Sequence, residues 1–403
     1  MSGAISAEDI DYILSTRAVR DRAGAMLERA LAGGTAFAVD LVKLEDAADI
    51  VVEVIRAQYP DLAVPYHSRW RHFVGDGGKL RAALDARLAA LAPEEASRAM
   101  LDLIVVSVLL DAGAGGAWGY VAPSGERVAR SEGLALASLA MFLDGSFSSD
   151  GSLRVDADRL AALDDAAIEA GFQVTEENPL LGVSGRTALL RQLGAALKAR
   201  SDVFPNGRPG DLIAYWEKTG GRAIDAGTVF DTVVEVFGSI WPSRTEVNGR
   251  NLGDTWRHPG LGEGVAGLVP LHKLSQWLSY SIIETLEIAG FSVPGIEKLT
   301  GLAEYRNGGL FLDSGVLALR DPAQAQVEHH PGGPLIIEWR SLTVALLDRI
   351  AAPVRARLGM TEAQFPLPRV LEGGTWLAGR KLAAQLRADG GSPLLIASDG
   401  TVF

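Results

Sequence analysis

Apolar residues recur at three- and four-residue spacing through most of this 403-residue chain, and such spacing is typical of amphipathic helices. The regular alternation of strand and helix that a doubly wound or barrel α/β fold needs is missing. Strand signals are sparse: residues 116–128 are typical of a hairpin, and residues 393–403 of a terminal strand. The sequence therefore predicts a mainly α, multi-helix globular fold with a minor β element. Helices are expected at residues 6–32, 43–57, 78–91, 95–112, 131–143, 182–199, 208–218, 226–238, 265–289, 335–358 and 371–388.

The length of the chain exceeds what one small hydrophobic core organises, so more than one region is expected. The segment 144–152, rich in Gly, Ser and Asp, is the best candidate boundary. It separates an N-terminal helical region, residues 1–150, from a helical region, residues 151–403, that carries most of the candidate functional segments. We expect these regions to pack as one compact unit.

The charge and the composition exclude several classes of protein. A formal net charge of −12 argues against nucleic acid as a general partner, although a small anion needs only a local cluster of positive charge. The chain has no cysteine, which excludes disulfides, thiolate metal sites and a cysteine nucleophile, and which suits the cytosol. The longest apolar run, residues 103–110, is far short of the ~20 residues of a membrane helix. The acidic N-terminus does not resemble a signal peptide. We therefore expect a soluble, cytoplasmic protein without a membrane partner.

A basic segment, "VPYHSRWRHF" at residues 64–73, contains His67, Arg69 and Arg71 within five positions. Its two histidines are five residues apart and do not share a helix face, so a helical zinc pair is a poor fit. Arg69 and Arg71 could form a fork for a phosphate or a carboxylate. The alternative is a solvated basic turn packed by Trp70.

Polar residues also interrupt the apolar segment 249–290. His272 and Gln276 lie four positions apart and share the face of a helix that is otherwise rich in Leu, Ile and Trp. Uncharged polar groups in such a place indicate hydrogen bonds to a ligand or a buried network. Asp254 and Trp256 lie in the glycine-rich loop before this helix, where Asp254 either belongs to a site or pairs with Arg257.

The segment "LTGLAEYRNGGLFLDSGVLALR" at residues 299–320 places Glu304, Arg306 and Asp313 in sequence that otherwise predicts buried core. Charged residues are rarely buried unless they are paired or lie in a site. A turn at 308–309 would bring Glu304 and Asp313 together. The alternative is a structural ion pair between Glu304 and Arg306 beside that turn.

Several long segments together resemble the fungal and bacterial uracil-catabolism family, long described as a domain of unknown function. The segments follow in the same order over nearly the whole chain: "PYHSRWRHF", "LLDAGAGGAW", "SEGLALASLAMF", "GFQVTEENPLLGVSGR", "HKLSQWLSYS", "GLAEYRNGGLFLDSGVL" and "LEGGTWLAGRKLA". The resemblance implies a pathway that releases urea from uracil by way of the nucleotide. It also implies a functional partner similar to a GTP cyclohydrolase, which opens the ring and leaves a ribosylurea phosphate.

A second resemblance concerns the chemistry. "LTGLAEYR" is similar to the "LT…ADYR" signature of the queuosine-nucleotide N-glycosidases, helical proteins related to helix-hairpin-helix DNA glycosylases. It implies such a fold in the C-terminal half and cleavage of an N-glycosidic bond in a nucleoside 5′-phosphate. Glu304 takes the position of the acidic residue, and Tyr305 and Arg306 match. This sequence departs from the signature in two ways: Glu replaces Asp, and "NGG" follows where that family has "VPQ".

We therefore expect an N-glycosyl hydrolase that cleaves a ribosylurea 5′-phosphate without a cofactor or a metal. Glu304 would act at the anomeric carbon, and Asp313 or Asp254 would be the second acid. One carboxylate is needed to stabilise the oxocarbenium-like state, and one acid is needed to protonate the poor leaving group. Two alternatives stay open: a metal-dependent amidohydrolase that uses some of the six histidines, and a non-catalytic carrier of the intermediate. The expected substrate-binding residues are Tyr305, Arg306, His272, Gln276, Arg69, Arg71, His67 and Trp256.

Overall fold

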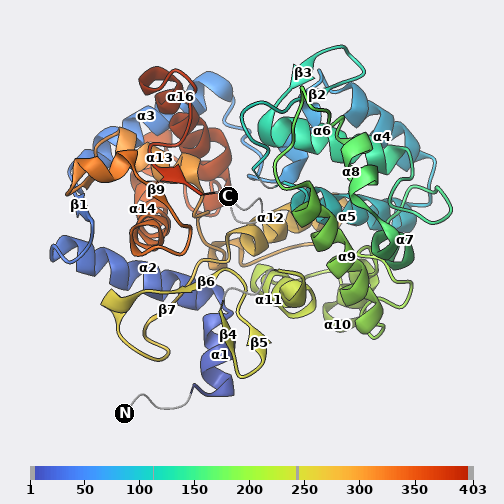
Figure 1. The fold of residues 1–403 in the computed structure, drawn as a ribbon, viewed down its shortest axis with the longest axis horizontal. Coiled ribbons are helices and arrows are strands. Elements are labelled where there is room, and N and C mark those ends of the chain that lie inside the picture. The colour runs from blue at the N-terminus through green and yellow to red at the C-terminus, as the bar shows by residue number, and fades with distance from the viewer. Residues whose placement is uncertain (1–4, 112, 242–244, 398–403) are drawn as a thin grey trace. The chain divides into compact units, whose positions relative to one another are not determined.

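A computed structural model describes residues 5–111, 113–241 and 245–397. The fold is mainly α-helical with short two-stranded sheets, which confirms the predicted class (Figure 1). The chain divides into two compact units, each made of discontinuous segments. Among the described residues, the first consists of residues 5–67, 245–276 and 295–397, and the second of residues 68–111, 113–241 and 277–294. Segment 144–152, where the sequence suggests a boundary, lies within the second unit. No described helix is both long and apolar enough to cross a membrane.

The first unit is built around the long helix α14, which packs against α2, α3 and α13, while α13 also packs against α16. A short antiparallel pair, β6 with β7, precedes the first turn of α12 (Lys273–Ile288). The helices are α1 (Ala7–Ile13), α2 (Thr16–Leu31), α3 (Lys43–Gln58), α13 (Tyr305–Asp313), α14 (Pro334–Leu358), α15 (Leu367–Val370) and α16 (Trp376–Leu386). The strands are β1 (Phe37–Val39), β4 (Glu246–Val247), β5 (Arg250–Asn251), β6 (Thr255–Arg257), β7 (Leu268–Pro270), β8 (Leu317–Leu319), β9 (Glu328–His329) and β10 (Leu395–Ile396).

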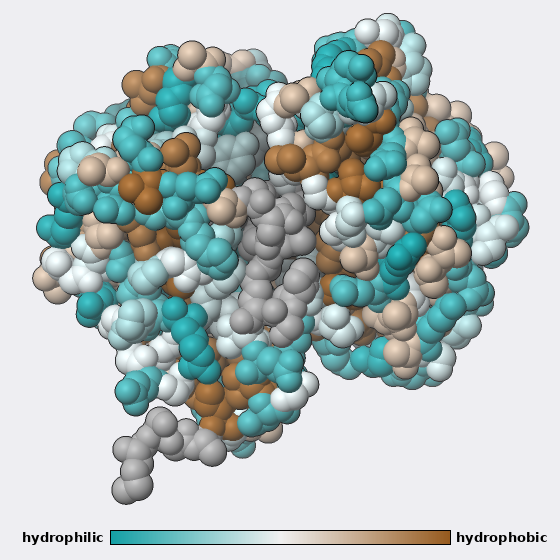
Figure 2. All heavy atoms as spheres, viewed as in Figure 1, coloured by the Kyte–Doolittle hydropathy of each residue, from teal (hydrophilic) through white to brown (hydrophobic). Residues whose placement is uncertain are grey.

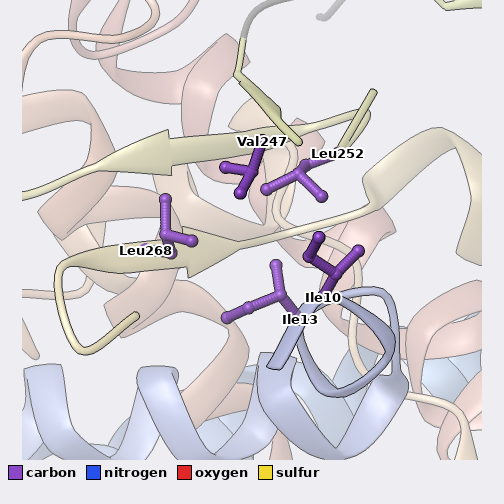
Figure 3. Close-up of a cluster of buried hydrophobic side chains, with 5 residues drawn as sticks. All are labelled: Ile10, Ile13, Val247, Leu252 and Leu268. Atoms are coloured by element: carbon purple, nitrogen blue, oxygen red, sulfur yellow. The ribbon is translucent and has the colours of Figure 1, made fainter. Parts of the chain in front are cut away.

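A satellite cluster of buried side chains fixes the N-terminal helix within this unit (Figure 3). Ile10 and Ile13 of α1 meet Val247, Leu252 and Leu268 from the β4–β7 region. Burial of each such side chain stabilises the fold by about 1.5–3 kcal/mol. The cluster therefore holds the backbone of α1 against the strands that lead into α12.

The second unit packs α5 against α6, α9 and α10. Helix α5 is buried from residue 99 to its end, which matches its nearly unbroken apolar sequence. Its one acidic interruption, Asp102, is paired with Arg208 at 2.6 Å. The unit's helices are α4 (Lys79–Ala89), α5 (Pro93–Leu109), α6 (Arg130–Leu143), α7 (Ala157–Ala162), α8 (Asp165–Gly171), α9 (Val183–Ala199), α10 (Asp211–Gly220), α11 (Ala226–Phe237) and the later part of α12. Its hairpin joins β2 (Tyr120–Val121) and β3 (Arg127–Val128), as the sequence predicts.

The helix predictions hold for most segments, and the differences have local causes. The segment 6–32 forms two helices because the Ser15 side chain caps α2 by accepting the N–H of Ala18. Residues 268–270 form a strand, so α12 starts later than predicted. The expected turn at 308–309 is wrong, since both glycines lie inside α13. The predicted terminal strand is present at Leu395–Ile396, and residues 398–403 lie outside the described residues.

The face of the molecule shown in Figure 2 is mostly hydrophilic, with small separate patches of apolar residues. The most exposed large apolar side chain is Val42, which is 81% exposed at the start of α3. Scattered exposed apolar residues of this kind are normal for a globular surface.

Candidate functional site

Glu304 is the N-cap of α13 and is only 8% exposed. Its two carboxylate oxygens accept the backbone N–H groups of Arg306 at 2.7 Å and Asn307 at 2.5 Å. Burial raises the pKa of Glu304 above its ordinary value, while these N–H groups and the positive charges of Lys273 and His67 offset part of the rise. The helix N-terminus thus holds a carboxyl group that binds a proton more tightly than an ordinary glutamate does.

Lys273 is the first residue of α12 and is 9% exposed. Its charge acts on Glu304, although the two residues are distant in sequence. The preceding residue, His272, adopts a left-handed backbone conformation with φ of 45°. Such a conformation is uncommon outside glycine and persists only where surrounding contacts enforce it. The His272 ring supplies one such contact, a 2.9 Å hydrogen bond between Nε2 and the carbonyl of Ile13.

His67 and Glu372 form a second buried group. The distance between His67 Nδ1 and Glu372 Oε2 is 2.6 Å, and the two residues are 4% and 7% exposed. Glu372 lies in a π-helical turn, Leu371–Thr375, between α15 and α16. A Cβ at Gly374 would lie 2.6 Å from Val51 of α3. This turn therefore lies so close to α3 that only glycine fits at this position. π-Helical turns within helices are frequent at functional sites.

One hydrogen bond connects the helix start that carries Glu304 to the turn that carries Glu372, and a close packing contact connects it to the helix that follows. The Thr375 hydroxyl donates to Asn307 Oδ1 at 2.8 Å, and both residues are fully buried. Gly379 of α16 lies against the same helix start, because a Cβ there would be 2.1 Å from the carbonyl oxygen of Arg306. The first unit therefore contains two buried carboxyl groups on elements that are tied together.

Asp254 and Arg340 form a buried ion pair that supports this arrangement. Arg340 donates to both oxygens of Asp254, at 2.8 and 2.7 Å, and its Nε donates to the carbonyl of Ala303 at 3.2 Å. Asp254 also accepts the backbone N–H of Lys273 at 3.1 Å. The pair thus connects the first residue of α12 to the residue before Glu304. The pairing of Asp254 with Arg257 was one of two alternatives, and in the structure Asp254 pairs with the more distant Arg340.

The environment of Asp254 keeps it ionised. Burial by itself raises the pKa of this carboxyl, but the charge and hydrogen bonds of Arg340 outweigh burial, and the net pKa is lowered. Trp256 adds an indole N–H bond at 2.8 Å. A carboxylate so fully paired serves as a structural anchor and is poorly suited to donate a proton.

Asp313 is not brought next to Glu304. The two residues are at opposite ends of α13, nine positions apart, which corresponds to about 13 Å along a helix. Asp313 instead forms a two-bond ion pair with Arg387, at 2.8 and 2.6 Å. The expectation that a glycine turn pairs the two carboxylates is therefore wrong. Gly308 is buried against Trp339, with only 2.7 Å between a Cβ there and the indole.

Tyr305 and Arg306 directly follow Glu304. Arg306 bonds Glu304 through its backbone N–H, while its guanidinium donates to the carbonyl of Gly390 at 2.7 Å and lies 4.7 Å from the centre of the Tyr305 ring. The contact between Glu304 and Arg306 is thus a helix cap. This differs from the side-chain ion pair weighed as an alternative.

Gln276, one turn after Lys273, is fully buried. Its Oε1 accepts the N–H of Thr300 at 3.3 Å, and within the described part of the chain its Nε2 has no hydrogen-bond partner. An unsatisfied buried donor is costly and calls for an explanation such as a ligand. His272 shares the helix start, and burial lowers its pKa, so its ring favours the neutral form.

Arg69 and Arg71 belong to the second unit and do not form a shared fork. Arg69 is fully buried and pairs with Asp111 at 2.8 Å, while Ser107 accepts its Nε–H. Arg71 pairs with Glu284 of α12. Each arginine therefore has its own carboxylate partner.

The histidines make separate contacts. His258 pairs with Glu338 at 3.2 Å, His329 bonds the carbonyl of Gln324, and His72 lies edge-on to Trp277. Over residues 5–111, 113–241 and 245–397, no three His, Asp or Glu side chains converge in a way that could hold a metal ion.

Lys273 and Glu372 are the residues that sequence reasoning missed. Glu372 stands beside two glycines in an apolar run, "LEGGTW", which is the same signal that marks Glu304. Lys273 is a single cation next to His272 in "LHKLSQW". Each of these two residues could have been recognised as a charge in core-like sequence. That Lys273 acts on Glu304, and that the turn of Glu372 is bonded to the start of α13, depends on contacts between residues remote in sequence.

The sequence matches the model of a protein family described as "Protein of unknown function (DUF1688)" over residues 12–403. It is 40% identical to "Protein urg3" of Schizosaccharomyces pombe over 411 residues, which covers 99% of this chain and 100% of that protein. It is 36% identical to "Uracil catabolism protein 4" of Lachancea kluyveri over 409 residues, or 92% of each chain.

Proposed function

Because this chain belongs to the DUF1688 family, we propose that it acts in uracil catabolism, as a hydrolase that cleaves the N-glycosidic bond of a ribosylurea 5′-phosphate and releases urea. The name of the relative from Lachancea kluyveri supports the pathway. The similarity of "LTGLAEYR" to the signature of nucleotide N-glycosidases supports the type of reaction. The observation that carries the proposal is the buried, cation-flanked carboxyl group of Glu304.

The proposed reaction adds water across the bond between C1′ of the ribose and a urea nitrogen. As this bond breaks, its electron pair moves to the nitrogen, which takes up a proton, and C1′ gains oxocarbenium character. Glu304 stabilises that positive charge and accepts a proton from the attacking water. The products are ribose 5-phosphate and urea. A raised pKa suits this role, since a base whose pKa lies closer to the working pH takes a proton more readily.

Three residues at the starts of α12 and α13 have roles that their surroundings suggest. The positive charge of Lys273 favours the carboxylate form of Glu304 and offsets part of the rise in pKa that burial causes. Gln276 would donate its Nε2–H to the ureido oxygen, which gives this buried amide the partner it lacks in the described residues. Tyr305 would contact the sugar, because it directly follows Glu304 at the start of α13.

The test is to incubate the purified protein with ribosylurea 5′-phosphate and to follow urea and ribose 5-phosphate by NMR. Glu304→Gln should abolish release of both products, whereas Glu297→Gln, an exposed glutamate seven positions earlier, should not change it. A sample treated with a chelator should keep its activity. The unphosphorylated ribosylurea, measured alongside, reports whether the 5′-phosphate contributes.

Three results would contradict the proposal. Release of ammonia and carbon dioxide without free urea, abolished by the chelator, would indicate a metal-dependent amidohydrolase. Tight binding of the substrate without any product would indicate a carrier. Full urea release by Glu304→Gln would exclude Glu304 as the base.

A further inference from the structure

Among the buried charges of the first unit, the pair of His67 and Glu372 has no role in the reaction described so far. Its Nδ1–Oε2 distance of 2.6 Å is short, and both residues are nearly inaccessible to solvent. Breaking the bond to urea needs more than a base at the sugar, because urea is a poor leaving group and its nitrogen must take up a proton. Asp254 and Asp313, the acids expected from sequence, are engaged in ion pairs with Arg340 and Arg387.

A second buried His–Glu pair in the same unit provides a contrast. His258 Nδ1 accepts the N–H of Gly260 at 3.1 Å, and Glu338 Oε2 accepts the N–H of Ala36 at 2.7 Å, so both partners also bind backbone groups. The distance between His258 Nε2 and Glu338 Oε1 is 3.2 Å. That pair joins the loop after β6 to helix α14 and has the character of a structural link.

The pair of His67 and Glu372 differs in where it lies. Glu372 is placed by the π-helical turn, and Thr375 of the same turn is bonded to Asn307, whose backbone N–H donates to Glu304. The charge of His67 acts on Glu304, so the imidazole lies within electrostatic range of the proposed base. The Trp376 ring lies 5.7 Å from the His67 ring and covers part of it.

We infer that His67 is the proton donor to the departing urea and that Glu372 positions it, an inference that rests on the proposed function. The contact between Nδ1 and Glu372 orients the imidazole ring, as a carboxylate does for a catalytic histidine. The proton on Nε2 then passes to the urea nitrogen as the C1′–N bond breaks. Water supplies the oxygen on C1′ and gives a proton to Glu304. Return of that proton through solvent restores His67.

The test compares two leaving groups on the same sugar phosphate. Ribosylurea 5′-phosphate needs a proton on its leaving nitrogen, while 4-nitrophenyl β-ribofuranoside 5-phosphate releases a stable anion that needs none. For His67→Asn we expect kcat on ribosylurea 5′-phosphate to fall by about 10²–10⁴-fold, the usual contribution of general acid catalysis. The rate with the nitrophenyl substrate should stay close to that of the unaltered protein. Glu304→Gln should lose activity on both substrates.

Glu372→Gln should show the same selective loss to a smaller degree, because glutamine keeps one acceptor for Nδ1 and loses the charge. A thermal melt of each variant shows whether it is folded. If His67→Asn does not fold, Glu372→Gln decides the test. Equal losses on both substrates would show that the pair is structural and would overturn the inference. So would unchanged rates of urea release. If the unaltered protein cleaves neither substrate, the proposed function itself fails. That result differs from equal losses on both substrates and from unchanged urea release, which would overturn only the role of His67.

Discussion

Replacing Asp254 with asparagine should destabilise the first unit strongly. The carboxylate accepts four N–H groups: two from Arg340, one from Trp256 and one from the backbone of Lys273. Asparagine retains one oxygen, and its NH₂ group then faces donors. Arg340 is 1% exposed, so its charge would be left buried without a counter-ion. Removing one partner of a buried ion pair costs about 3–5 kcal/mol in the free energy of unfolding.

Urea unfolding followed by tryptophan fluorescence measures that loss, and a double-mutant cycle with Arg340→Met isolates the pair. A loss of this size corresponds to a fall of roughly 6–20 °C in Tm for a unit of this kind. The double variant should be less destabilised than the sum of the two single variants, because it removes both charges. A single-variant loss below about 1 kcal/mol, or strictly additive losses, would refute the reasoning.

The pH dependence of this effect has a definite sign. The folded-state pKa of Asp254 is lowered, since Arg340 outweighs the effect of burial. The stability from the pair is therefore fully present above the ordinary pKa of aspartate, about 3.9, and is lost as the pH falls through the folded-state value. The difference between the unaltered protein and Asp254→Asn should be constant near neutral pH and should shrink in acid. An unchanged difference down to strongly acidic pH would contradict this.

Three further changes test other parts of the structure. The pKa of Glu304 is raised in the folded state, so the unaltered protein loses stability as the pH rises above 4.5. Glu304→Gln lacks this loss, and its Tm relative to the unaltered protein should therefore increase over that range. Thermal melts at a series of pH values would show no such trend if the pKa were not raised. Gly379→Ala should lower the free energy of unfolding, measured with urea, by about 1–3 kcal/mol and should also lower urea release, because the added Cβ would displace the carbonyl of Arg306. An unchanged free energy of unfolding would mean that α13 and α16 can move apart without cost. Asp313→Asn should lower the free energy of unfolding by about 1–3 kcal/mol, because it weakens the hydrogen bonds to Arg387, and should leave kcat nearly unchanged. A large loss of kcat would instead indicate that Asp313 is a catalytic acid.

The local sequence predicts where most of the helices lie, but it predicts little of which helices pack against each other. Periodic apolar positions place α3, α9 and α14 within a few residues of their observed bounds. Helix α13 was missed because two adjacent glycines predict a turn, whereas Trp339 packs so closely that Gly308 is needed within a helix. Local propensity gives way here to a contact with α14.

The candidate site shows the same limit. Glu304 is recognisable as a charge in core-like sequence. Its relation to Lys273 and Glu372 is not, because each comes from a different element and their approach depends on packing. Asp254 shows why proximity in sequence misleads: Arg257 is three positions away, yet the partner is Arg340.

The π-helical turn at Leu371–Thr375 has a consequence for how relatives of this chain can be compared. Such a turn contains one more residue than an α-helical turn would. Deleting that residue would restore regular helical bonding and rotate Glu372 by about 100° relative to α16, away from the imidazole of His67. A family member with a one-residue gap at this place would thus keep a helix while losing the His–carboxylate pair. The length of this turn can therefore distinguish family members that can form the His–carboxylate pair from those that share only the fold.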